Sequence, residues 1–347
     1  MKLITDLSLT SARRNRGTWL AAYAVNGTKP VLVADYRGNV FGTTARSDFG
    51  SLHSFSRPSN AWGYDANGML ASFTADEPRL ISSLNDGIRL GLLLEPGSQN
   101  KLPSPAMTGM ATGVLSSGGA LPTGWSTLNI ASSAVTVTDI TPLSGLPRIR
   151  LQISGTPTSG DVYVFFSPRT EIVASAGQSW AASAFLALSG GSFSNVSNIR
   201  FYGIGWTASG GFVSGSTVNF NGTNLLTSIT DNLKRQSFIG SLSEAASERL
   251  QIGLRLDTSG SIDFTLDIAL AQLEQGSIVS SPIPSSTARA GETIGLSALN
   301  GTYDLRAETA SGSVSTFLAQ AVTPGYWPPA LASGTLRSMI VYPAGTL

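Results

Sequence analysis

The chain has 347 residues, of which only 12% are charged, and its 22 basic and 21 acidic residues give a formal net charge of +1. Near neutrality without a polybasic segment argues against nucleic acid and an anionic membrane surface as partners. The absence of cysteine excludes disulfides and zinc–thiolate sites, and the single histidine, His53, excludes a histidine-rich metal site. No apolar stretch approaches the roughly 18 residues of a membrane span, so we expect no membrane insertion. Asp6 and the arginines from Arg13 interrupt the N-terminus and leave no apolar core for a secretory signal peptide.

The first predicted region comprises residues 1–105. It is punctuated by prolines and ends in Leu102-Pro103-Ser104-Pro105. Residues 1–50 carry several arginines but little acid, and residues 30–34 (PVLVA) resemble a short strand. This region therefore predicts a small β structure with a basic start.

The second predicted region, residues 106–286, alternates apolar and polar residues with a period of two. Such alternation indicates strands with one buried and one wet face, and hence an antiparallel β-sandwich. The predicted core positions are Ile149, Leu151, Ile153, Leu250, Ile252, Leu254, Leu256, Ile262, Phe264, Leu266, Ile268 and Leu270. Arg249 and Arg255 should lie on the opposite face. Residues 241–250 are the one segment that could hold a short helix.

The third predicted region, residues 287–347, has one hairpin signal over residues 301–317 and a proline-rich segment, PGYWPP, at residues 324–329. About 60 residues with one hairpin make a thin core, so this region should pack on a neighbour. Asn-Gly pairs, as at Asn67-Gly68, favour tight hairpin turns. The fold class is mostly β: a jelly-roll-like antiparallel β-sandwich with smaller N-terminal and C-terminal β regions.

None of the candidate catalytic patterns is specific enough to predict a catalytic site. Asp65 begins a faint calcium-loop pattern without the distal acidic ligands, so a turn capped by Asp65 is expected. Asp263 and Asp267 lie roughly 13 Å apart along one strand, too far for a glycosidase pair. They should form a solvated face balanced by Arg249 and Arg255. His53 lacks a nucleophile motif around it. We predict no catalytic residue, no enzyme activity, no metal and no cofactor.

An aromatic pattern provides the one candidate binding site. Arg200, Tyr202 and Trp206 share one parity of a predicted strand, so their side chains leave the same face. Aromatic rings beside an arginine can stack a sugar ring and hydrogen-bond its hydroxyls. The competing interpretation is that Tyr202 and Trp206 cover a core edge or a subunit interface.

Three sets of motifs together resemble fibre or spike structural proteins of tailed bacteriophages. The first runs from Arg57-Pro58-Ser59-Asn60-Ala61 through Pro78-Arg79-Leu80 and Gly91-Leu92-Leu93-Leu94-Glu95 to Gln99-Asn100. The second, Leu121-Pro122-Thr123-Gly124-Trp125 with Gln272-Leu273-Glu274 and Ser281-Pro282-Ile283-Pro284, is similar to a carbohydrate-binding-module-like jelly roll. The third joins Gly301-Thr302-Tyr303-Asp304 to Tyr326-Trp327-Pro328-Pro329. Ser98 and Ile283 depart from the usual pattern, and the motif residues look structural.

The resemblance implies a virion structural protein, a fibre, spike or tail component, that contacts host-surface glycan through the sandwich. A capsid decoration or cement protein is the alternative, and a glycan depolymerase is less favoured because no β-helix repeat is evident. The implied partners are other copies of the chain, with a homotrimer favoured, other capsid or tail proteins and host-surface glycan. Residues 1–105 would serve as the anchoring region in the phage particle. Trp327 is expected to bury against another subunit or domain.

Overall fold

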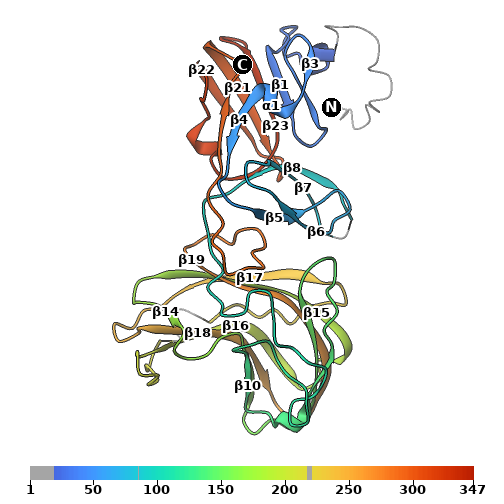
Figure 1. Cartoon of the computed structure of the whole chain (residues 1–347), viewed down its shortest axis with the longest axis vertical. Coiled ribbons are helices and arrows are strands. Elements are labelled where there is room, and N and C mark those ends of the chain that lie inside the picture. The colour runs from blue at the N-terminus through green and yellow to red at the C-terminus, as the bar shows by residue number, and fades with distance from the viewer. Residues whose placement is uncertain (1–18, 85, 217–220) are drawn as a thin grey trace. The chain divides into compact units, whose positions relative to one another are not determined.

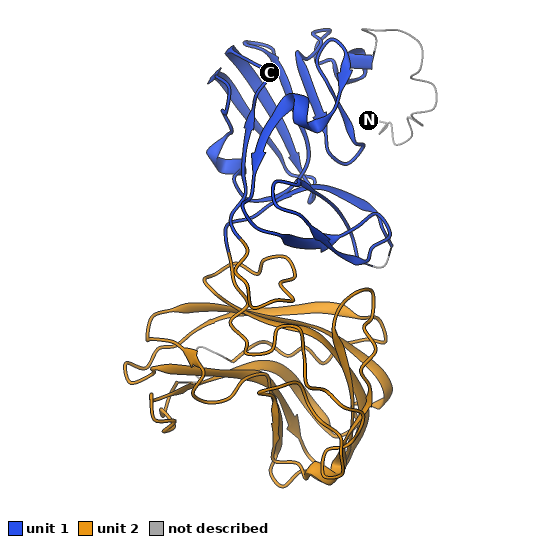
Figure 2. Cartoon of the chain, viewed as in Figure 1, with its two compact units in different colours: residues 1–97, 290–347 blue, residues 98–289 orange. Residues whose placement is uncertain are grey.

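The computed structural model describes residues 19–84, 86–216 and 221–347. The chain divides into two compact units (Figure 2): unit 1 takes residues 1–97 and 290–347, and unit 2 takes residues 98–289. The sequence indicated three regions, 1–105, 106–286 and 287–347. The structure differs because the first and third share one sheet, in which β23 (Gly334–Pro343) pairs with β1 (Leu32–Asp35) and β8 (Arg89–Leu94). Unit 2 is thus inserted within the sequence of unit 1.

Unit 2 consists of two antiparallel sheets around one core (Figure 1). One sheet has the order β17-β15-β19-β12-β11-β9. In the other, β10, β13, β18 and β14 form the main path, and β16 pairs with β18. The bounds are β9 (Gly113–Val114), β10 (Ser126–Leu128), η3 (Ser132–Ala134), β11 (Val135–Asp139), β12 (Arg148–Gly155), β13 (Asp161–Phe165), β14 (Ile172–Val173), β15 (Ser179–Ser192), β16 (Val196–Trp206), β17 (Lys234–Ser241), β18 (Arg249–Thr258) and β19 (Ile262–Gln275).

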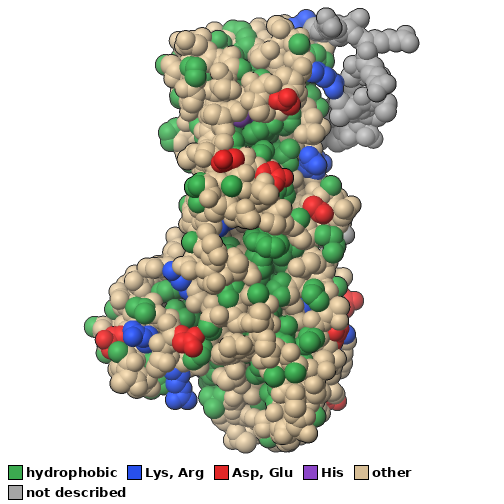
Figure 3. Space-filling model, viewed as in Figure 1, with side chains coloured by type: hydrophobic (Ala, Val, Ile, Leu, Met, Phe, Trp, Pro, Cys, Tyr) green, Lys and Arg blue, Asp and Glu red, His purple; other side chains and the backbone are tan. Residues whose placement is uncertain are grey.

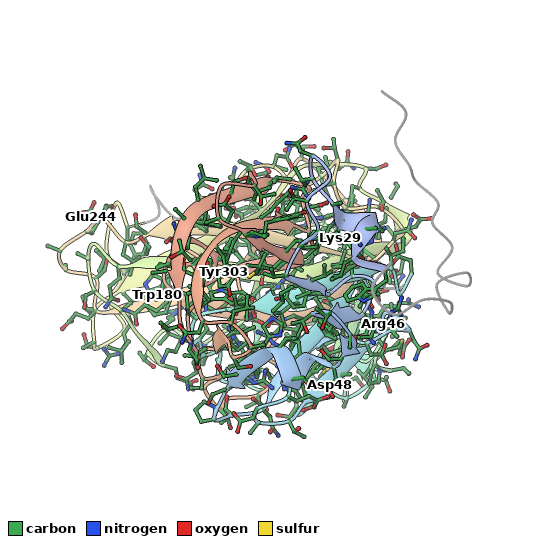
Figure 4. All side chains as sticks on the ribbon, turned by 90° about the horizontal axis from the view of Figure 1, so that it is seen from above. Lys29, Arg46, Asp48, Trp180, Glu244 and Tyr303 are labelled. Carbon is green, nitrogen blue, oxygen red and sulfur yellow. The ribbon has the colours of Figure 1, made fainter. Side chains whose placement is uncertain are left out.

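The core of unit 2 confirms the predicted sandwich. It contains Ile149, Leu151, Ile153, Leu250, Ile252, Leu254, Leu256, Ile262, Phe264, Leu266 and Ile268, together with Trp180, which is labelled in Figure 4. Full burial of one such side chain stabilises the fold by about 1.5–3 kcal/mol. The alternation changes phase at Leu270, where φ is 40° and the register with β15 shifts. This β-bulge turns Ala271 and Leu273 into the main core cluster, while Leu270 is buried, as predicted, but lies outside that cluster.

Polar residues of the sequence motifs form hydrogen bonds near the two ends of unit 2. The side chain of Asn100 accepts a hydrogen bond from Leu273 N at 3.1 Å and donates to Ile283 O at 3.2 Å. Gln272 Oε1 accepts from Ile283 N at 2.8 Å. Ser98 and Arg289 exchange two backbone hydrogen bonds of 2.9 and 2.7 Å, so the segments that enter and leave unit 2 are bridged to each other. These contacts give Asn100 and Gln272 a structural role.

Unit 1 is built on a sheet with the order β22-β21-β23-β1-β2-β3, to which β8 and β7 are added through β23. The predicted hairpin is present as β21 and β22. Two separate ribbons pair β5 with β6 and β20 with β4. The remaining bounds are η2 (Trp19–Tyr23), β2 (Val40–Gly42), β3 (Arg46–Ser47), α1 (Phe49–Leu52), β4 (His53–Ser56), β5 (Ala61–Tyr64), β6 (Leu70–Phe73), β7 (Arg79–Ser82), β20 (Thr293–Leu296), β21 (Gly301–Thr309), β22 (Val314–Val322) and η4 (Pro329–Leu331).

Local side-chain bonds explain several turns of unit 1. Asp48, labelled in Figure 4, caps the one-turn helix α1 because its Oδ1 accepts from Ser51 N at 2.8 Å. Asp65 caps the β5–β6 turn by accepting from Asn67 N at 2.8 Å and Met69 N at 3.0 Å. The predicted Asp65 turn is therefore confirmed.

A buried charge cluster joins the two sequence segments of unit 1. Glu292 accepts from Arg57 Nη1 at 3.0 Å and from Arg79 Nε at 2.7 Å, and all three side chains have no exposed surface. Glu95 pairs with Arg79 at 2.9 Å. Two cations therefore face two anions, which offsets the cost of removing them from water. Arg57, Arg79 and Glu95 are motif residues, and the structure brings them together.

Of two smaller expectations, the one of a helix was wrong. Residues 242–248 contain no helix and instead form a turn between β17 and β18, since so short a segment gains little from helix formation. Trp327 packs on residues of the predicted N-terminal region, as expected for a neighbouring domain: its ring lies 6.1 Å from that of His53, and its Nε1 donates to Leu331 O at 3.1 Å. Among the described residues, none of the helices has both the length and the apolar character to cross a membrane. Figure 3 shows charged side chains scattered thinly over the visible face, in keeping with the low charged fraction.

Candidate functional site

The outer face of the β13–β18–β16 sheet gathers aromatic and charged side chains. The cross-strand register places Asp161 opposite Asp257, and Tyr163 opposite Arg255. On the other side of β18, Arg200 lies opposite Arg255 and Tyr202 opposite Gly253. We call the set Asp161, Tyr163, Arg200, Tyr202, Arg255 and Asp257 the Tyr–Arg face. Its members alternate with core residues such as Val162 and Phe201, so the sheet that buries the core also fixes this face.

The charges of the Tyr–Arg face are paired. Asp257 contacts Arg200 Nη2 and Arg255 Nε, each at 2.8 Å. Asp161 Oδ2 lies 3.3 Å from Arg255 Nη2 and accepts from the Tyr163 hydroxyl at 2.7 Å. The two arginines, which would repel each other as direct neighbours, are therefore held by two carboxylates. All four charged side chains keep 16–26% of their surface exposed, so they remain accessible to a ligand.

The aromatic rings pack around Arg255. Its guanidinium carbon lies 5.8 Å from the Tyr163 ring centroid and 5.2 Å from that of Tyr202. Tyr163 also stacks on Phe165, with centroids 5.2 Å apart and planes 8° from parallel. Burial raises the pKa of Tyr163 most, and the hydrogen bond to Asp161 raises it further, so the phenol stays protonated and donates. Burial alone would raise the pKa of Asp161, but hydrogen bonds from Tyr163 and Asn129 lower it. The result is a pre-organised layer of rings, donors and acceptors.

The structure places the three candidate residues on one strand face but in different surroundings. Arg200 and Tyr202 belong to the Tyr–Arg face and are half-buried. Trp206 extends from the same face of β16 but is only 8% exposed. Sequence reasoning missed Tyr163, Arg255, Asp161 and Asp257. The alternations Asp161-Val162-Tyr163 and Arg255-Leu256-Asp257 mark them as outward residues, but their neighbours across the sheet depend on the pairing of β13, β18 and β16.

The other acidic candidates form a different group from the one expected. Asp267 is buried and lies on β19, in the six-stranded sheet, whereas Arg249 and Arg255 lie on β18 in the other sheet. Its partners are instead Arg148 at 3.1 Å and Arg150 at 2.8 Å, on the adjacent strand β12. The expectation of a solvated face balanced by Arg249 and Arg255 was thus wrong for Asp267, because the two strands belong to different sheets.

His53 is part of the core of unit 1. Its Nδ1 lies 3.2 Å from Phe49 O, and its Nε2 lies 3.0 Å from the Tyr36 hydroxyl. A carbonyl can only accept, so Nδ1 carries the proton and Nε2 accepts from Tyr36. The imidazole also stacks on Phe49 at 4.5 Å. Burial lowers its pKa to about 4, which keeps the ring neutral. In the described part of the chain, no three acidic or histidine side chains gather as a metal site.

Comparisons with known proteins found only distant structural likenesses. No protein-family model matches the sequence, and no curated protein matches it. An arabinose-bound α-L-arabinofuranosidase, MgGH51, gives a TM-score of 0.38 at 16% identity, over 52% of this chain and 27% of that protein. A structure of carbohydrate-binding modules from the β-sandwich superfamily gives 0.34 at 13% identity, over 67% of this chain and 90% of that one.

A third likeness is to the N-terminal CBM22-1–CBM22-2 tandem domain of Paenibacillus barcinonensis Xyn10C. It has a TM-score of 0.30 and 13% identity, over 63% of this chain and 85% of the other. This chain therefore spans about a quarter of the arabinofuranosidase and most of the two binding-module structures. At these TM-scores the likenesses carry no argument about ligand or activity.

Proposed function

We propose that the chain binds glycan through the Tyr–Arg face of unit 2. The observation that carries the proposal is the layer in which Tyr163 and Tyr202 flank Arg255, and Asp161 and Asp257 pair with it on the same face. The apolar face of a sugar ring stacks on aromatic rings, while its hydroxyls bond to guanidinium and carboxylate groups. The ion pairs already hold these groups in place, so binding needs little further ordering.

A glycan array with purified full-length protein, followed by calorimetry, tests this proposal. Tyr202→Ala and Tyr163→Ala should each weaken binding by about 1–3 kcal/mol, the magnitude of base stacking on aromatics. The matched control is Tyr303→Ala, which removes a half-buried tyrosine from unit 1. Binding that survives both changes in the Tyr–Arg face would contradict the proposal. Loss of assembly or a large drop in melting temperature, without an array signal, would support a subunit interface instead.

We propose further that this glycan-binding chain is a structural component of a tailed-phage virion, in a fibre, spike or tail, and that it assembles as a homotrimer. The support is the ordered set of motifs, whose residues Arg57, Arg79 and Glu95 meet in one buried cluster of unit 1. The protein's position in a virion density map tests this role. A location scattered over the capsid shell would favour a decoration protein.

Residues 1–105 are proposed to anchor the chain in the particle, and removing unit 1 as a whole tests this role better than deleting residues 1–50. That deletion removes β1, which lies between β23 and β2 in the sheet of unit 1, while residues 1–18 lie outside the described part of the chain. Residues 98–289, expressed as unit 2 alone, should remain soluble and bind glycan without entering particles. Incorporation of unit 2 alone would contradict an anchor in unit 1.

A further inference from the structure

Trp206 is covered by two side chains that are themselves exposed. The guanidinium carbon of Arg169, from the loop between β13 and β14, lies 4.7 Å from the Trp206 ring centroid. The ring of Phe212, from the turn after β16, meets Trp206 edge-on at 5.8 Å and 72°. Phe212 is 60% exposed, whereas Trp206 is 8% exposed. Two surface side chains thus cover a ring that shares a strand face with Tyr202.

The outer face of β16 also carries polar atoms without a partner. The indole Nε1 of Trp206 is buried and makes no hydrogen bond. Asn198 Oδ1 and Arg200 Nε are likewise buried and unpartnered, and they lie on the same strand face. A buried tryptophan N–H usually finds an acceptor, and leaving it without one is costly. The Trp206 donor under the two covering side chains, and the Asn198 and Arg200 atoms farther along β16, could therefore bond a ligand that has hydroxyl groups.

The turn that carries Phe212 has hydrogen bonds of its own and is also bridged to β16. Thr207 N donates to Gly211 O, and Gly210 N donates to Thr207 O, each at 2.9 Å. Gly210 and Gly211 directly precede Phe212, and Gly210 has a φ of +83°. Within this turn, Ala208 N donates to Glu248 Oε2 at 2.8 Å, which links the turn to the residue before β18. Because Phe212 is bridged to Trp206 and Val213 N donates to Gly205 O at 3.1 Å, the backbone can stay in place while the exposed Phe212 ring leaves the indole by rotating about its side-chain bonds.

We infer that Arg169 and Phe212 form a displaceable cap over a second stacking position at Trp206, and that the glycan bound by the Tyr–Arg face extends beneath it. This inference rests on the proposed function. Tyr202 and Trp206 are four strand residues apart, which is roughly 13 Å. A single sugar cannot cover both rings, so the ligand class is a linear oligosaccharide. When the cap opens, one sugar ring replaces Arg169 and Phe212 on the indole.

The cap should lower the apparent affinity for long ligands only. A ligand that needs the open state binds with an affinity reduced by the fraction of molecules that are open. Loss of the exposed cation–π contact and loss of the edge-to-face ring pair should each raise the open fraction by about threefold. Removing both should therefore tighten binding of a long oligosaccharide by about tenfold. A disaccharide that occupies only the Tyr–Arg face should bind as before.

The test compares Arg169→Ala, Phe212→Ala and the double variant with the wild-type chain. The probes are hexasaccharides of β-1,4-glucose, β-1,4-xylose and α-1,4-glucose, with the matching disaccharides, measured by calorimetry. Val173→Ala is the matched control, because Val173 is 68% exposed and lies beyond Arg249 in the same row of the sheet. Acrylamide quenching, taken as the difference from Trp206→Phe in each background, reports the exposure of Trp206 without any glycan.

The expected result is a gain of about tenfold for a hexasaccharide in the double variant, no gain for its disaccharide, no change in Val173→Ala, and stronger quenching of Trp206. Binding that depends on Tyr202 but does not change in the double variant would overturn the cap and leave the proposed function standing. Equal gains for hexasaccharide and disaccharide would also overturn it. Absence of binding to every probe, in wild type and double variant alike, would overturn both.

Discussion

Replacing Glu292 by glutamine probes the charge cluster that joins the two sequence segments of unit 1. The carboxylate accepts from Arg57, from Arg79 and from Glu95 N at 2.7–3.0 Å, and its side chain has no exposed surface. Glutamine keeps the size but removes the charge, and its amide N–H faces arginine donors. Breaking one partner out of a buried ion pair costs about 3–5 kcal/mol. For a unit of this size the melting temperature should fall by roughly 6–20 °C.

Differential scanning calorimetry of the full chain measures this change, with the transition of unit 2 as an internal reference. The matched control is Glu308→Gln, which breaks the 3.2 Å pair between Glu308 and Arg337 in the same unit. Both side chains of that pair are 30% exposed, so its loss should cost no more than about 1 kcal/mol. If Glu292→Gln lowered the transition of unit 1 no further than Glu308→Gln, the argument that the buried cluster holds unit 1 together would be refuted.

Two further perturbations follow from the structure. Burial lowers the pKa of His53 from 6.5 to about 4, so the unfolded chain takes up a proton at a pH where the folded chain does not. The free energy of unfolding of unit 1, measured by urea titration, should therefore be highest above pH 6.5 and fall by about 3 kcal/mol by pH 4. An equally steep fall over this pH range in His53→Phe would contradict the assignment. Gly253→Ala should lower the melting temperature of unit 2, because a Cβ there would lie 2.3 Å from Val164 O. Gly160→Ala, whose Cβ would meet nothing closer than 3.8 Å, should not, and equal effects would refute the clash.

Periodicity predicted the parts of the fold that depend on one strand at a time. The alternation within β18 alone shows that Ile252 and Leu254 face the core, because successive side chains of a strand point to opposite faces. The same logic placed Arg200 and Tyr202 on a common outer face. It failed after Leu270, because a bulge adds one residue and reverses the parity of Ala271 and Leu273.

Pairing between distant strands could not be predicted in this way. Arg255 meets Arg200 and Tyr163 only because β18 lies between β16 and β13, and Asp267 meets Arg150 only because β19 pairs with β12. The covering of Trp206 depends on Arg169, from a loop far away in sequence. Residues 1–105 and 287–347 were predicted as separate regions because nothing in the local sequence indicates that β1 and β23 share a sheet.

The insertion of unit 2 has a consequence for the order of folding. Unit 1 cannot complete its sheet until the chain has returned at residue 290, and closing an open loop as long as unit 2 would cost several kcal/mol. Ser98 and Arg289 are already hydrogen-bonded to each other within unit 2, so folding of unit 2 brings the two ends together and removes most of that cost. We therefore expect unit 2 to fold first. In pulsed hydrogen exchange during refolding, amides of β18 and β19 should become protected before those of β23, and protection of β23 first would refute this order.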